Sequence, residues 1–165
     1  MTTQIAEDTR RLRNALSQFP AGVVALSATV QGERQVLVAS SFSVGISEEP
    51  PLVLFSVQKS SSTWPKIKDA PLIGVSVMGE DHNPLCRQLA SRNPDERFQG
   101  VETVSGERDD LYIAGSPLWL TCSIYNEVDA GDHILILLRI EEFQAHNAHM
   151  PLVFHRSAFS RLDPR

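Results

Sequence analysis

Apolar and polar positions follow two different periods along this chain. In the first segment, "EDTRRLRNALSQFP", the apolar residues are three or four positions apart: Leu12, Ala15, Leu16 and Phe19. This spacing predicts one amphipathic helix whose apolar stripe packs on another surface and which ends before Pro20. After Pro20, β-branched and small apolar residues dominate, and these favour strands.

Seven later segments have the composition of strands, and the first two read as a hairpin with a short glycine-containing turn. They are "AGVVALSATV" (21–30), "QVLVASSFSVGI" (35–46), "PLVLFSVQ" (51–58), "LIGVSVMG" (72–79), "SPLWLTCSIYNEV" (116–128), "DHILILLRIEEF" (132–143) and "PLVFH" (151–155). We expect short helices only near 63–69 and 83–91, and a polar surface loop over 93–110. Because strands and helices do not alternate, the pattern favours a closed or partly closed antiparallel barrel over a doubly wound nucleotide-binding fold.

Composition narrows the class of protein. A chain of 165 residues with 42% hydrophobic residues fits one domain, 1–165, with a barrel core over about 18–160. The net charge of −5 predicts no broad basic face, so we expect neither nucleic acid nor a membrane as a partner. The N-terminus is polar and no apolar stretch approaches the roughly 18 residues of a membrane span, so we expect a soluble, cytoplasmic protein.

Cysteine and histidine spacing argues against a metal site. Cys86 and Cys122 lie outside any C-x-x-C pair, so we expect buried, reduced thiols. His146 and His149 are three residues apart in "QAHNAHMP" and have no evident third ligand. We therefore interpret both histidines as solvated loop residues.

The segment "VQKSSSTWPKIKDA" (57–70) has the composition of an anion-binding site, although the usual glycine-rich nucleotide motifs are missing. Lys59 supplies a cation, and Pro65 suits the start of a helix. Hydroxyl and backbone N–H donors lie between them, from Ser60, Ser61, Ser62 and Thr63. The alternative is that Ser62 or Thr63 only caps the helix.

A second group of hydroxyls lies in "VASSFSVGIS", on what should be a half-buried strand: Ser40, Ser41, Ser43 and Ser47. Hydroxyls in such a place either contact a polar ligand or face water and neighbouring strands, and the residues alone leave both readings open.

A third feature is "GDH", where Gly131, Asp132 and His133 interrupt a strand pattern before its most apolar run. Here a histidine can be a general acid, a ligand contact or a structural residue. Trp64 and Trp119 could stack on a ring, but we expect them to pack in the core or at an interface.

Taken together, five segments resemble the flavin reductase-like, split-barrel flavin-binding family. They are "FPAGVVALSA", "SSFSVGISEEPPLVLFSVQKSSSTWP", "CRQLASRNPDERFQGV", "GDHILILLRIEEF" and "PLVFHRSAF". The resemblance covers residues 15–160. These segments resemble the small reductase component of two-component flavin-dependent monooxygenases. The resemblance implies a mainly β fold, a six-stranded antiparallel Greek-key split barrel with a few flanking helices, assembled as a homodimer.

The resemblance also implies a set of site residues. Ser40, Ser41, Ser43 and Ser47 would contact the flavin ring; Gln58, Lys59, Ser60, Ser61, Ser62 and Thr63 would hold the ribityl phosphate; Ser91, Arg92 and Phe98 would flank the flavin; and His155 and Phe159 match a C-terminal "H-R-G-x-Y/F" pattern. This chain departs from the family at two places: "VLVASSF" replaces the common "G-M-T-A-N-S-F", and "HRSAF" lacks the glycine.

The implied activity is hydride transfer from NADH or NADPH to FMN or FAD, with reduced flavin passing to a separate oxygenase. Most of this chemistry belongs to the cofactors, so the protein contributes mainly the placement of the two rings. His133 is the candidate catalytic residue that orients the nicotinamide or manages the proton, and Asp132 would fix its tautomer. The alternative is a non-catalytic flavin carrier or storage protein.

Overall fold

The structure is a computed structural model that describes residues 2–163. Its helices are α1 (Thr2–Leu16), α2 (Trp64–Ile67) and α3 (Asn83–Leu89), with 3-10 turns η1 (Glu80–His82) and η2 (Pro94–Glu96). Its strands are β1 (Ala21–Gly22), β2 (Val24–Val30), β3 (Glu33–Ala39), β4 (Ser43–Glu48), β5 (Pro51–Gln58), β6 (Ile73–Val77), β7 (Thr103–Ser105), β8 (Leu111–Ile113), β9 (Leu118–Ala130), β10 (His133–Ala145), β11 (Leu152–His155) and β12 (Ala158–Arg161).

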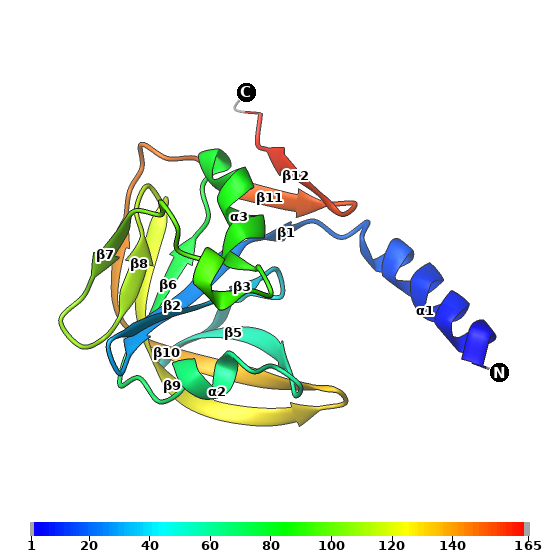
Figure 1. Cartoon of the computed structure of the whole chain (residues 1–165), viewed down its shortest axis with the longest axis horizontal. Coiled ribbons are helices and arrows are strands. Elements are labelled where there is room, and N and C mark those ends of the chain that lie inside the picture. Colours follow the sequence, from blue (N-terminus) through cyan, green and yellow to red (C-terminus); the bar gives the residue numbers. More distant parts are fainter. Residues whose placement is uncertain (1, 164–165) are drawn as a thin grey trace.

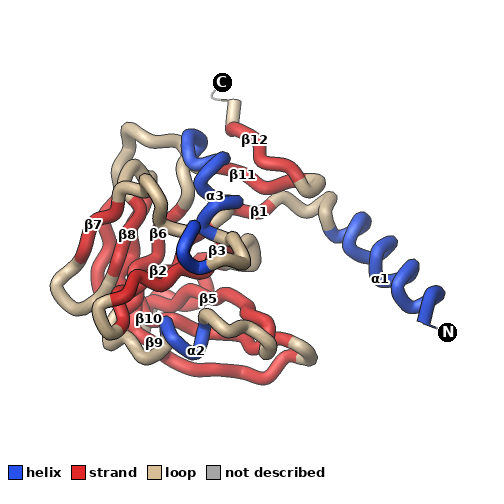
Figure 2. Tube along the Cα trace, viewed as in Figure 1, coloured by secondary structure: helices blue, strands red, loops and turns tan. Residues whose placement is uncertain are grey.

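A curved antiparallel sheet in the order β3-β2-β6-β9-β10-β5-β4 forms the body of the molecule (Figure 1). Figure 2 shows how strands dominate, with the short helices α2 and α3 lying against the sheet. The Ser41 hydroxyl links the segment after β3 to β5: its Oγ lies 3.1 Å from both the backbone O and the backbone N of Ser56. The expectation of a mainly β, split-barrel architecture is confirmed.

Alternation along the strands divides the apolar side chains between two cores. On β2, Val24 and Leu26 belong to the core enclosed with Phe55, while the intervening Ala25 belongs to a second core with Leu89 of α3. The sheet is therefore buried on both faces along β2, which explains why this strand reads as a continuous apolar run.

Several element boundaries differ from the sequence prediction. The expected strand 35–46 is two strands, β3 and β4, because the chain turns at Ser40–Phe42, so the main sheet has one more strand than expected. The expected surface loop 93–110 contains η2 and β7. Strand β8, buried throughout, was missed because "LYI" is too short to show a period.

Helix α1 extends away from the sheets (Figure 1). Its apolar residues Ile5, Leu12 and Leu16 are 60%, 57% and 63% exposed. The expectation that this stripe packs on another surface is therefore not met by the residues that the structure describes. The helix also ends four residues before Pro20, at Leu16.

The two cysteines are free and buried, as expected. Burial raises the pKa of the Cys86 thiol to about 11 and that of Cys122 to about 12. Both side chains therefore remain neutral thiols at physiological pH and behave as small core residues.

His82 is the buried histidine of the fold, and backbone groups engage both of its ring nitrogens. Its Nδ1 accepts a hydrogen bond from Gly79 N at 3.0 Å, and its Nε2 donates to Ala114 O at 2.9 Å. Nδ1 can accept only while the ring is neutral. Burial lowers the pKa of His82 and nearby His149 lowers it further, against the opposing effects of the Ala114 contact and Asp81.

This arrangement predicts an acid-sensitive fold. The unfolded chain takes up the His82 proton near the ordinary pKa of 6.5, whereas the folded chain does so only at lower pH. The stabilisation by neutral His82 should therefore be complete above pH 6.5 and be lost as the pH falls through the lowered pKa. His82→Ala should lower the free energy of unfolding at pH 7.5 by about 1–3 kcal/mol, and the gap to wild type should narrow at pH 5. Urea denaturation at both values checks this; a constant gap would contradict it.

Candidate functional site

The antiparallel ladder between β5 and β10 brings two of the predicted site segments together. Gln58, the last residue of β5, pairs with His133, the first residue of β10. One residue beyond the strand, Lys59 N donates a hydrogen bond to Asp132 O at 3.0 Å. Residues 58–63 therefore start beside the turn between β9 and β10, next to "GDH".

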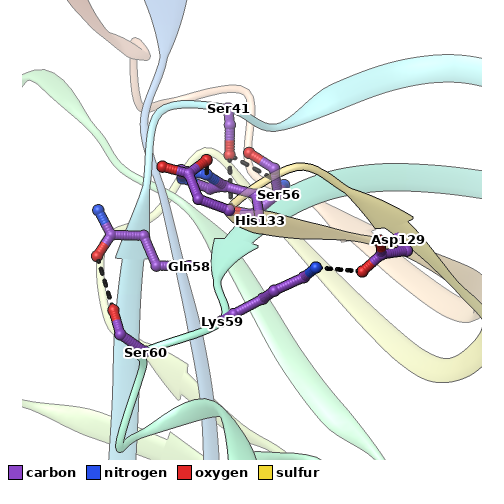
Figure 3. Close-up of polar contacts among 8 residues, drawn as sticks. Ser41, Ser56, Gln58, Lys59, Ser60, Asp129 and His133 are labelled. Carbon is purple, nitrogen blue, oxygen red and sulfur yellow. Dashed lines mark hydrogen bonds and ion pairs between the residues drawn. The ribbon is translucent and has the colours of Figure 1, made fainter. Parts of the chain in front are cut away.

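The Lys59 side chain forms an ion pair with Asp129 of β9 (Figure 3). Both side chains are accessible, at 43% and 79% exposure. Two residues earlier on β9, Glu127 lies 3.9 Å from Lys68 Nζ. The cation expected to meet a phosphate thus already faces a carboxylate, and no local pattern in the sequence indicates that partner because it comes from a distant strand.

The hydroxyl groups of residues 60–63 have different partners. Thr63 is the N-cap residue of α2, as the sequence-based alternative allowed, but its side chain makes no capping hydrogen bond. Ser61 Oγ instead accepts from Trp64 N, the first backbone N–H of the helix, at 3.1 Å. Ser60 Oγ donates to Gln58 Oε1 at 3.3 Å, while Ser62 is exposed. Because Ser61 Oγ acts as an acceptor in this contact, its own hydrogen is available to an incoming oxygen atom.

Arg97 is a further candidate site residue, which sequence reasoning missed. Its Nη1 donates to Thr63 Oγ1 at 3.1 Å and its Nε to Ser91 O at 2.8 Å. The guanidinium therefore joins the loop after α3 to the segment 58–63, and it leaves the Thr63 hydroxyl hydrogen available in the same way as that of Ser61. The only signal was a charged residue before Phe98 in a stretch interpreted as a surface loop.

The predicted flanking residues Ser91, Arg92 and Phe98 lie on this loop. Ser91 Oγ donates to Glu96 Oε2 at 3.1 Å, which holds the loop together, and Arg92 is exposed. Phe98 is buried in the second core, and the Arg34 guanidinium lies 4.6 Å from its ring centre. Phe98 thus anchors this loop to the second core.

The four serines between β3 and β5 differ in their contacts and exposure. Ser41 is engaged with Ser56, as described, whereas Ser40 and Ser43 are exposed. Ser47 pairs with Leu52, and the ladder shifts register between Ser43 and Ser47. Gly45, with φ of +71°, sits in this bulge, where a side chain would be strained.

His133 and Asp132 contact each other directly. His133 Nδ1 lies 2.7 Å from Asp132 Oδ1, and this hydrogen bond, helped by the charge of the ring, lowers the pKa of Asp132. A carboxylate at Nδ1 favours the tautomer with hydrogen on that nitrogen. His133 Nε2 is then the acceptor of the neutral ring, which is the tautomer control expected from the sequence.

His155 and Phe159 lie in a different sheet, in the order β1-β11-β12. His155 Nε2 donates to Gln18 O at 3.1 Å, and the Phe159 ring packs 5.3 Å from that of Phe154. The structure does not join them to residues 58–63 by any contact among the described residues. They fix the segment that follows α1.

The expectation that His146 is a solvated loop residue is wrong. Its Nδ1 donates to Ser116 O at 2.8 Å, and its ring packs edge-on to Trp119 at 4.5 Å. His149 is exposed. Trp64 is buried against Phe55, so it packs in the core as expected.

A cavity of about 590 Å³ lies at the other end of the β9–β10 hairpin, lined among others by Trp119, Tyr112, Glu141 and Phe143. Trp119 is eleven residues from Ala130 along β9, roughly 35 Å at the usual rise per residue. The volume of this cavity lies within the range of small-molecule binding sites. The cation and hydroxyl groups that the sequence assigns to a phosphate lie instead in residues 59–63.

Comparison with known proteins decides the family. A model described as "Flavin reductase like domain" matches residues 16–163. The chain belongs to the flavin reductase family.

Named reductases and a solved reductase structure resemble this chain over nearly its full length. The chain is 31% identical to the reductase subunit HsaB of a flavin-dependent monooxygenase from Rhodococcus jostii strain RHA1, over 96% of this chain and 80% of the relative. It is 30% identical to a flavin reductase of Pseudomonas putida, over 93% and 90%. The structure of the Streptomyces globisporus C-1027 NADH:FAD oxidoreductase SgcE6 in complex with NAD and FAD fragments superposes with a TM-score of 0.88 at 28% identity, covering 96% of this chain and 94% of that one.

Membership of the flavin reductase family confirms the expected oxidoreductase class. It also favours the catalytic reading over the non-catalytic carrier, because these relatives are named as reductases and oxidoreductases. No helix in residues 2–163 is long and apolar enough to cross a membrane.

The cap at α2 gives a test of how the reductase builds the start of this segment. Ser61→Ala should lower the free energy of unfolding by about 0.5–2 kcal/mol, because Trp64 N loses its acceptor. Ser62→Ala, at an exposed position, should stay within about 0.5 kcal/mol of wild type. Chemical denaturation of both variants provides the measurement, and a larger loss for Ser62→Ala would contradict the assignment.

Proposed function

We propose that this flavin reductase oxidises NADH or NADPH, binds FMN or FAD by its phosphate at residues 58–63, and supplies the reduced flavin to a separate monooxygenase. One observation carries the proposal. The pairing of Gln58 with His133 means that segment 58–63 starts at the first residue of β10, where the candidate histidine lies.

The residues present fit an anionic group. Lys59 supplies a positive charge at the start of the segment, and the Ser61 and Thr63 hydroxyls can donate while their oxygens accept from Trp64 N and Arg97. Charge-assisted hydrogen bonds are roughly twice as strong as neutral ones, so a phosphate would be the favoured occupant of this donor set. Because α2 has a single turn, its dipole adds little, and the individual donors carry the argument.

The flavin, when bound, supplies the ring that accepts hydride from the dihydronicotinamide. His133 is 35% exposed in its side chain, so it can reach a ligand while Asp132 fixes its Nδ1. Its role is to orient the nicotinamide and to hold or release a proton at Nε2. The proteins named as monooxygenase reductase subunits support an oxygenase as the partner that receives reduced flavin.

Catalytic turnover tests the proposal. With purified protein, excess flavin and excess pyridine nucleotide, oxidation of the nucleotide should continue through many cycles for at least one pairing of FMN or FAD with NADH or NADPH. The rate of each of the four pairings also determines nucleotide preference. Oxidation that stops at one equivalent, or none in any pairing, would instead favour a flavin carrier.

Replacement of His133 separates catalysis from binding. His133→Ala should slow flavin reduction in stopped-flow mixing by roughly 10- to 1,000-fold, because positioning and proton management are both lost. FMN affinity should change by less than about threefold, and His133→Asn should recover part of the rate if positioning dominates. Normal reduction by the alanine variant, combined with a lower melting temperature, would make His133 a purely structural residue.

We further expect a homodimer that covers α1. An isolated helix of this length is marginal in water, and the exposed stripe of Ile5, Leu12 and Leu16 gives it a face to bury. Light scattering at micromolar concentration should therefore give twice the chain mass, and a Leu12→Asp, Leu16→Asp variant should shift toward monomer. A monomeric wild type would contradict this expectation.

A further inference from the structure

The lysine that should meet the flavin phosphate is already paired with a carboxylate. Lys59 Nζ contacts Asp129 Oδ1, and Figure 3 shows the lysine side chain directed at Asp129. The other parts of the proposed phosphate site do not involve this aspartate. Ser61 contacts Trp64, and Thr63 contacts Arg97.

Strand β9 presents two carboxylates on one face, because residues two apart on a strand point the same way. Asp129 pairs with Lys59 at the start of segment 59–68, and Glu127 lies near Lys68 at its end. Lys68 follows α2, away from the hydroxyls of residues 60–63. Segment 59–68 thus takes part in two similar ion pairs, and the proposed phosphate cation belongs to the first of them.

The Lys59–Asp129 pair is weak enough to exchange. Both side chains are well exposed, and ion pairs at such positions contribute little to stability. A phosphate carries more charge than a carboxylate and can also accept from the nearby hydroxyls. It can therefore displace Asp129 from Lys59, and Asp129 can return when the phosphate leaves.

We propose that Asp129 competes with the flavin phosphate for Lys59 and so keeps flavin affinity low enough for the reduced flavin to be released. The proposal rests on the function proposed above. A reductase that supplies flavin to another enzyme must let its product go in every cycle. An aspartate that re-forms the ion pair with Lys59 offsets the loss of the phosphate contact.

The competition predicts an effect that depends on the phosphate. Asp129→Asn frees Lys59 from its carboxylate partner, so FMN should bind about three- to tenfold more tightly. Riboflavin, which has no phosphate, should bind with unchanged affinity. Glu127→Gln is the matched control, because it removes the same charge from the same face of β9 but frees Lys68 instead of Lys59.

The experiment measures the dissociation constants of FMN and riboflavin by flavin fluorescence at about 0.15 M ionic strength, where screening limits long-range effects. It uses wild type, Asp129→Asn, Glu127→Gln, Lys59→Met and the Asp129→Asn, Lys59→Met double variant. Of the four variants, only the Asp129→Asn single variant should bind FMN more tightly than wild type. Lys59→Met should bind FMN more weakly. Adding Asp129→Asn to the Lys59→Met variant should change FMN affinity little.

Three results would overturn the inference while leaving the proposed function in place. Equal gains in FMN affinity in Asp129→Asn and Glu127→Gln would show that the loss of any nearby negative charge is enough to explain the effect. A gain that persists without Lys59 would show that the ion pair is irrelevant. An Asp129→Asn affinity equal to wild type, in a protein that binds FMN and turns over, would refute the competition and leave the reductase function intact. Failure of wild type to bind FMN or to turn over would instead refute the function, and the inference with it.

Discussion

The ladder between β5 and β10 is the constraint on which the candidate site depends. Its final pair, Gln58 with His133, fixes where β5 ends relative to the β9–β10 turn. A slip by one residue would turn every side chain of β5 to the opposite face and bury Gln58 in place of Val57. Burial of Val57 and Phe55 therefore holds the register, and the register places Lys59 beside Asp132. The core positions the site without contributing a polar atom to it.

The polar groups of the candidate site are of two kinds, hydroxyls that can donate to a ligand and charged side chains that already have acidic partners. The Ser61 and Thr63 oxygens are engaged by Trp64 and Arg97, which orient their hydroxyl hydrogens without consuming them. The charged groups are arranged differently, since Lys59 faces Asp129 and His133 faces Asp132. Each of these two side chains thus has an acidic neighbour at the same end of the β9–β10 hairpin. Under the proposed function, these acidic neighbours would favour a diffusible flavin over a permanently bound one.

The sequence predicted what depends on local pattern and missed what depends on distant contacts. Strand composition indicated the mainly β fold and placed β5 and β10 nearly to the residue, because their apolar runs are long and end in polar residues. The break at Ser40–Phe42 was missed, because "VASSFSVGI" continues an apolar alternation through the turn. Arg97 and Asp129 were missed for another reason: each acts on a residue more than thirty positions away, and no local period reports such a pairing. The sequence also could not show what covers the apolar stripe of α1, which is exposed among the residues that the structure describes.

The central claim is that the flavin phosphate binds at residues 58–63 with the rings beside His133. A crystal structure of the protein with FMN tests it most directly. The account predicts electron density for the phosphate within hydrogen-bonding distance of the Ser61 and Thr63 hydroxyls, with Lys59 turned from Asp129 toward the phosphate and the ring system next to His133. Density for FMN in the cavity near Trp119 and Glu141, at the other end of the β9–β10 hairpin, with the Lys59–Asp129 pair intact, would contradict it.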